Sequence, residues 1–138
     1  MIGELLINNQ DAYTAFGVVM GDDFINNLLA PVDLKELIEN ESGLENGKRV
    51  LYSNLKLAAR DVTLSFCIHG ADEADYLRKY RTFVEELQKG KICIHVPKLG
   101  AEIYKMTYLK SSSFAMNVTR TSSKISIRFN EPNPADRK

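Results

Sequence analysis

Residues 60–83 read RDVTLSFCIHGADEADYLRKYRTF, and this stretch decides the fold because a strand pattern passes directly into a helix pattern. Apolar and polar side chains alternate along Val62–Ile68, which is the period of two of a strand with one buried face. After the short turn Gly70–Asp72, apolar residues recur at spacings of one, three and four, as on an amphipathic helix. The residues of this apolar stripe are Tyr76, Leu77, Tyr80, Phe83, Val84 and Leu87.

The ends of this helix carry the usual start and stop signals. Asp72 is placed to cap the first turn, and Asp75 suits the positive end of the helix dipole. Gly90 is the residue type that commonly ends a helix. The sequence therefore predicts one main α-helix from about Asp72 to Lys89.

Most of the remaining apolar patterning is typical of short strands. The predicted strand segments are ELLI (4–7), YTAFGVVM (13–20), RVLYS (49–53), KICIHV (91–96), EIYKMTYLK (102–110), SFAMNVT (113–119) and SKISIRFN (123–130). A polar, turn-like NNQDA (8–12) separates the first two. The expected fold class is α+β and mostly β: an antiparallel β-sandwich or half-open β-barrel that carries one main helix.

The 138 residues fit one β-rich domain over residues 1–132, followed by a polar C-terminal tail at 133–138 that contains Pro134. Within the domain, residues 21–46 have weak patterning and are expected to form an extended arm or loop, with at most one helical turn at Leu34–Glu39. Asn46-Gly47 then gives a turn signal. Long excursions of this kind usually have a function or are ordered by a partner.

Charge and composition exclude several classes of protein. Eighteen basic and eighteen acidic residues balance, so no overall field draws the chain to nucleic acid or to anionic membranes. The sequence contains no long apolar run and no leader pattern at Met1, so we expect neither a membrane span nor export by a signal peptide. The two cysteines are expected to be reduced thiols.

Two Cys-x-His pairs are the sharpest local coincidence: Cys67 with His69, and Cys93 with His95. Side chains two apart on a strand share a face, so four zinc-type ligands would converge if the two strands were neighbours. The spacing lacks the wrapping geometry of structural zinc sites, and Cys and His are also ordinary strand residues. We therefore assign no metal ligand, although whether the pairs meet stays open.

No catalytic or nucleic-acid-binding motif stands out either. A histidine two residues from a cysteine on a strand lies beside the thiol without a third group to orient it. In YLRKYR (76–81) the aromatic residues fall on the helix's apolar stripe, which favours core packing over contact with bases. We expect no catalytic residue, no cofactor, no specific nucleic-acid binding and no enzymatic activity.

Residues 60–96 resemble the core of phage tail proteins of the distal-tail family. Residues 37–50 (LIENESGLENGKRV) resemble the loop that precedes the family's third strand, most like prophage versions from gut bacteria. The resemblance rests on Arg60 at the start of a strand, the turn at Gly70–Asp72, Gly90-Lys91 before the next strand, and Tyr104 in the strand after it. The opening residues 4–20 are also similar to the family's N-terminal strand pair. The resemblance covers roughly residues 3–132 and depends on pattern and order.

This resemblance implies a tail-tube-like fold and a structural role. It implies a ring of copies, six in number, at the junction of tail tube and baseplate, with DNA passing through the ring. The implied partners are further copies of the chain and other tail or baseplate proteins; the implied location is the virion tail, after assembly in the bacterial host cytoplasm. The alternative from a different class is a small β-rich adaptor or ligand-binding domain.

Overall fold

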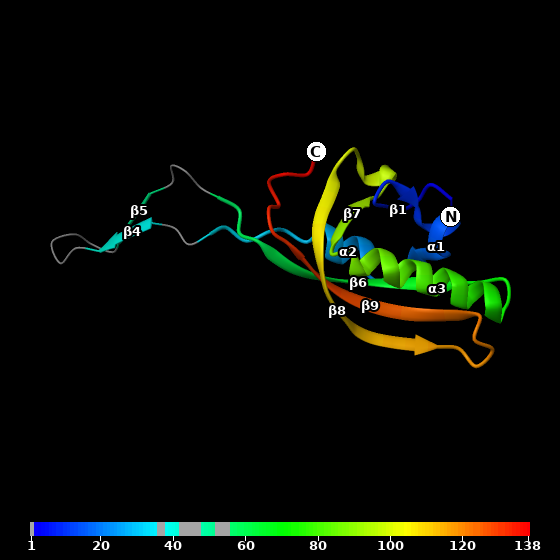
Figure 1. Cartoon of the computed structure of the whole chain (residues 1–138). Helices are drawn as coiled ribbons and strands as arrows, with labels where there is room; N and C mark the ends of the chain where they lie inside the picture. The colour runs from blue at the N-terminus through cyan, green and yellow to red at the C-terminus, as the bar shows by residue number, and fades with distance from the viewer. Residues whose placement is uncertain (1, 36–37, 42–47, 52–55) are drawn as a thin grey trace.

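The computed structural model describes residues 2–35, 38–41, 48–51 and 56–138. Their main feature is one open, antiparallel seven-stranded sheet with the strand order β2-β1-β7-β8-β9-β6-β3 (Figure 1). Its strands are β1 (Leu6–Ile7), β2 (Gln10–Asp11), β3 (Val18–Met20), β6 (Arg60–His69), β7 (Lys91–His95), β8 (Ile103–Met116) and β9 (Ser122–Glu131). The helices are α1 (Ala12–Phe16), α2 (Phe24–Leu29), α3 (Glu73–Gln88) and a 3-10 turn at Pro97–Leu99. The predicted α+β, mostly β fold class is confirmed.

The central ladder joins β6 to β9 along its whole length, from Arg60 opposite Glu131 to His69 opposite Ser122. The predicted alternation is confirmed, because Val62, Leu64, Phe66 and Ile68 of β6 are all buried. Across the ladder they face the buried residues Phe129, Ile127, Ile125 and Ser123. One face of the sheet therefore forms the core and the other face carries polar side chains.

The predicted helix is confirmed as α3, which lies across the core face of the sheet (Figure 1). Asp72 caps it by accepting a hydrogen bond from the backbone N–H of Asp75 at 2.8 Å. The chain leaves the helix at Gly90, whose φ is +92°. Tyr76 and Phe83 bury the helix's apolar stripe against the sheet.

An aromatic cluster fills the space between α3 and the sheet. The Phe66 ring lies 5.2 Å from that of Phe24, 5.6 Å from Phe83 and 6.3 Å from Phe129, measured between ring centroids. All three rings meet Phe66 edge-on, an arrangement that aromatic pairs prefer. Residues from α2, β6, α3 and β9 thus share one core.

The strand predicted over Tyr13–Met20 is wrong in its first half, where α1 forms, and correct only for β3. Asp11 caps α1 by accepting from the N–H of Thr14 at 2.8 Å. Gly17 ends the helix with φ +66°, and its N–H bonds back to the Tyr13 carbonyl. The helix is too short for its period to appear in the apolar pattern, so the two caps are its only local signal.

The segments predicted separately at 102–110 and 113–119 form one long strand, β8. The polar residues Lys110–Ser113 look like a break in the sequence, but they lie within the strand and are exposed. The pairing of β8 with β9 shifts register near Leu109 and again near Ser112. Such bulges let a strand bend, and Figure 1 shows the curvature of β8.

The extended segment expected at 21–46 is divided differently. Residues 24–29 form α2, whose Phe24 and Leu28 are buried in the core. Of the helical turn expected at Leu34–Glu39, the described residues are not helical, because Leu34 bridges to Leu57 and Ile38 begins β4; residues 36–37 lie outside the described part of the chain. The turn signal at Asn46-Gly47 lies outside the described residues.

We call residues 31–59 the arm. Its described parts include β4 (Ile38–Glu41) and β5 (Lys48–Leu51), which pair with each other in an antiparallel two-stranded sheet. Figure 1 shows this hairpin well away from the seven-stranded sheet. None of the helices in the described part of the chain has the length and apolar character to cross a membrane.

Candidate assembly surfaces

The two Cys-x-His pairs lie apart. Cys67 and His69 are on β6 and line a hollow of ≈ 280 Å³, whereas Cys93 and His95 are on β7 and line another of ≈ 370 Å³. Strands β8 and β9 separate β6 from β7 in the sheet. The four side chains therefore do not form one site, and the described residues contain no group of three or more His, Cys, Asp or Glu side chains able to hold a metal ion.

The aromatic residue Tyr76 of α3 packs in the core, as expected, and two basic residues of the helix pair with a carboxylate. Tyr76 is buried and donates its hydroxyl hydrogen to Ser123 Oγ at 2.7 Å. Arg78 and Lys79 form ion pairs with Asp75. The N–H of Ala71, together with these two cations, holds the pKa of Asp75 well below its usual range. These charges stabilise the first turns of the helix.

The outer half of β8 has an open edge. Strand β7 pairs only with Ile103–Thr107, and the last bond on that side runs from Tyr108 N–H to the Gly90 carbonyl. We call residues 109–116 the β8 edge. They pair with β9 on one side, and no strand among the described residues pairs with them on the other. An unpaired edge of this length is a template for adding a strand.

Apolar side chains accompany the β8 edge. Leu109, Phe114 and Met116 are 46%, 45% and 42% exposed, although each is a large hydrophobic residue. The Phe114 ring lies 5.4 Å from that of Tyr80 on α3, which places it on the core face just beyond the cover of the helix. Exposed apolar side chains that gather beside an open edge mark an interaction surface.

The base of the arm is a second exposed strand pair. Lys35 N–H donates to the Lys56 carbonyl at 2.9 Å, and Ala58 N–H donates to the Asp33 carbonyl at 2.8 Å. Between these bonds Leu34 lies opposite Leu57, and both leucine side chains are exposed. The arm is thus a paired ribbon at its base, and its apolar side chains are uncovered.

A buried ionic cluster lies where the arm joins the sheet. The Arg60 guanidinium donates to Glu131 Oε1 at 2.7 Å and to the carbonyls of Leu28 and Ala30 at 2.9 and 3.0 Å. Arg137 donates to both Glu131 oxygens at 2.9 Å. Burial alone would raise the pKa of Glu131, but hydrogen bonds from Arg137 and Arg60 outweigh it and hold that pKa below its ordinary value.

The sequence indicated only part of these surfaces. The sequence singled out Arg60 only through the family resemblance and predicted no contact for its side chain. The missed partner is Glu131, which follows the inward-facing positions Ile125, Ile127 and Phe129 at the same spacing of two. A carboxylate in an inward position needs a cation, and that signal was present. The β8 edge could not be foreseen, because strand order is not encoded in local periodicity.

Comparison with known proteins finds a solved structure of similar fold. No protein-family model and no curated protein matches the sequence. Among solved structures, the chain is similar to SPP1 Dit (gp 19.1), described as "a Paradigm of Hub Adsorption Apparatus in Gram-positive Infecting Phages", with a TM-score of 0.59 and 15% sequence identity. The match covers 95% of this chain and 50% of that one, so this chain spans about half its length. The chain therefore has the fold of a phage tail hub protein.

Proposed function

We propose that the chain is a structural component of a phage or phage-like tail, whose copies join in a ring of six at the junction of tail tube and baseplate. The observation that carries the proposal is the β8 edge, whose backbone is unpaired on one side and has three exposed apolar side chains beside it. The fold of the chain is also similar to that of a phage hub protein. Its partners are further copies of itself and neighbouring tail or baseplate proteins, and its place is the virion tail.

The β8 edge and the arm supply the two halves of a head-to-tail contact. An extended segment can add to an open sheet edge through main-chain hydrogen bonds, while side-chain contacts set the register. The arm offers a paired ribbon with exposed Leu34 and Leu57, and the β8 edge offers unpaired backbone beside Phe114 and Met116. Because the two surfaces differ, the contact is heterologous and closes into a ring when the rotation between copies allows it.

Shortening the arm tests the proposal. Replacing residues 36–55 by Asn-Gly keeps α2, the bridge between Leu34 and Leu57, and Arg60, and closes the ribbon with a favoured hairpin turn. We expect the variant to keep the helix signal in circular dichroism and the cooperative thermal unfolding of the intact chain, and to lose only the β4–β5 pairing. It should also lose higher-mass species in light scattering. A shortened variant that associates as the intact chain does would remove the arm from the interface.

A small adaptor or ligand-binding domain is the second candidate. The hollow of ≈ 370 Å³ beside Asn8, Cys93 and His95 favours it, because it is of the size that receives small ligands. This candidate predicts a monomer or dimer whose mass does not grow toward six copies, whether or not the arm is present. The same light-scattering comparison therefore separates the two functions.

A further inference from the structure

We propose that Arg60 and Glu131 form a joint that fixes the direction of the arm relative to the sheet and couples the arm, through Arg137, to the C-terminal segment. The consequence for assembly rests on the function proposed above. The joint itself can be tested on the monomer.

Arg60 lies where both connections of the arm meet the sheet. The chain enters the arm just after α2 and returns from it at Arg60, the first residue of β6. The Arg60 guanidinium bonds the carbonyls of Leu28 and Ala30, at the departing end, while its own backbone belongs to the returning strand. One planar cation thus clamps the two ends together, using the fixed donor geometry that lysine lacks.

Helix geometry explains why α2 needs this cation. The last carbonyls of a helix have no partner within it and must find donors elsewhere. At the end of α2 the Arg60 guanidinium supplies donors to the carbonyls of Leu28 and Ala30. Without them, the carbonyls where the arm begins would lose this partner, and the arm's departing end would be held less firmly.

Glu131 makes the clamp rigid. Its side chain is 0% exposed and that of Arg60 is 11% exposed, so the pair is shielded from water and from salt. The carboxylate stands directly opposite Arg60 in the β6–β9 ladder. It therefore sets the direction of the guanidinium, and Arg60 in turn sets the direction of the arm.

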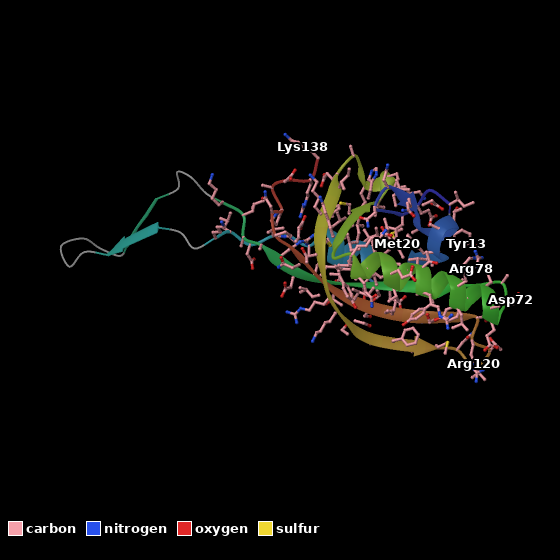
Figure 2. The ribbon with its side chains drawn as sticks, viewed as in Figure 1. Tyr13, Met20, Asp72, Arg78, Arg120 and Lys138 are labelled. Atoms are coloured by element: carbon pink, nitrogen blue, oxygen red, sulfur yellow. The ribbon has the colours of Figure 1, made fainter. Side chains whose placement is uncertain are left out.

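Arg137 brings the C-terminal segment to the same carboxylate. Its guanidinium carbon lies 4.6 Å from the centre of the Tyr104 ring, and its carbonyl accepts from the N–H of Ile103 at 2.9 Å. In Figure 2, Lys138 lies at the end of the body away from Asp72, which is the end from which the arm departs. A partner that displaces either the arm or the C-terminal segment would therefore displace Glu131, and through Glu131 the other segment.

Amide hydrogen exchange on the monomer tests the joint. In Arg60→Ala we expect exchange about tenfold faster at the arm-base amides of Lys35 and Ala58, since charge-assisted hydrogen bonds of this type are lost. Glu131→Gln, the milder variant, should speed amide exchange at Lys35 and Ala58 and also at Ile103. Arg128→Ala is the matched control, because it removes an exposed ion pair with Asp61 on the neighbouring part of the same ladder.

The outcomes are distinct. Equal exchange at Lys35 and Ala58 in Arg60→Ala and Arg128→Ala would overturn the joint. Loosening of the arm base in Glu131→Gln without any change at Ile103 would overturn the coupling. Unchanged protection of β6 and β9 in the same spectra shows that a variant is folded. An intact chain that never associates would refute the proposed ring, but the exchange rates of the monomer would still test the joint.

Discussion

At the scale of single residues, the alternation of apolar and polar side chains along β6 and β9 is enough to identify most of the core. Phe66, Ile127 and Phe129 are buried where a period of two puts them. The same alternation continues to Glu131, whose burial is offset by Arg60 and Arg137. Periodicity alone could predict that an inward carboxylate needs a cation, but not that the cations would come from the directly opposite residue of β6 and from the C-terminal segment.

The buried carboxylate leads to a prediction for stability against pH. Because the folded-state pKa of Glu131 is below its unfolded value, its contribution is fully present above the unfolded pKa of about 4.5 and is lost as pH falls toward the folded pKa. Glu131→Gln should lower the free energy of unfolding at pH 7 by about 3 kcal/mol, because it leaves the partly buried guanidinium groups of Arg60 and Arg137 without their anion. It should also flatten the fall in stability between neutral pH and pH 3, as measured by urea titration.

Asp61→Asn is the matched control for that titration. Asp61 pairs with Arg128 on the exposed face of the same ladder, where water and salt screen the ion pair. It should leave the free energy of unfolding at pH 7 nearly unchanged. If the two variants lost stability equally, burial of the Arg60–Glu131–Arg137 cluster would not be what makes it stabilising.

At the scale of elements, the strand–turn–helix stretch at 60–83 was predicted correctly because both of its periods run long enough to be recognised. Short elements were not. The five residues of α1 complete little more than one turn, and α2 is only six residues long, so neither establishes a stripe. The two segments that form β8 looked separate because its outer half lies at an edge and carries polar and apolar residues without alternation.

Gly70 explains why the turn at 70–72 is so short. A Cβ at this position would lie 2.5 Å from Tyr76 Cα and would also clash with the Tyr76 backbone nitrogen, so the first turn of α3 packs directly on the end of β6. We expect Gly70→Ala to destabilise the protein by about 2 kcal/mol or more, since backbone must move to admit the methyl group. Thermal unfolding followed by circular dichroism measures the change.

Gly3→Ala is the control that distinguishes the cost of a steric clash from the cost of backbone strain. Gly3 has φ +81°, but a Cβ there would meet nothing within 4 Å. Its substitution should therefore cost only the strain of a left-handed backbone, about 1 kcal/mol. If Gly70→Ala cost no more than Gly3→Ala, close helix–strand packing would not be the reason for glycine at position 70.

At the scale of the whole molecule, part of the sheet is covered by a helix and part of it is left uncovered. Helix α3 covers the sheet over Phe66 and Phe129, while the β8 edge and the exposed leucines at the base of the arm are uncovered. These two surfaces follow from strand order and from the path of the arm. Neither can be read from the sequence, because each depends on contacts between residues far apart in the chain.

The apolar side chains beside the β8 edge should matter for association and little for folding. Phe114→Glu places a charge on the open surface, where burying an unpaired charge against the neighbouring copy and losing apolar contact both oppose docking. We expect it to weaken association at least about tenfold in sedimentation velocity and to leave the unfolding midpoint within a few degrees. Lys124→Glu, an exposed change on the opposite face of β9, is the control and should not weaken association.

The mass of the intact chain in solution, followed by light scattering from micromolar to millimolar concentration, tests the central claim most directly. The account predicts growth from the monomer mass of 15.6 kDa to a closed species of six times that mass. It also predicts that Phe114→Glu needs at least about tenfold higher concentration to reach the same mass. A mass that remains at 15.6 kDa for the intact chain at every concentration would contradict a self-assembling tail ring and favour the adaptor.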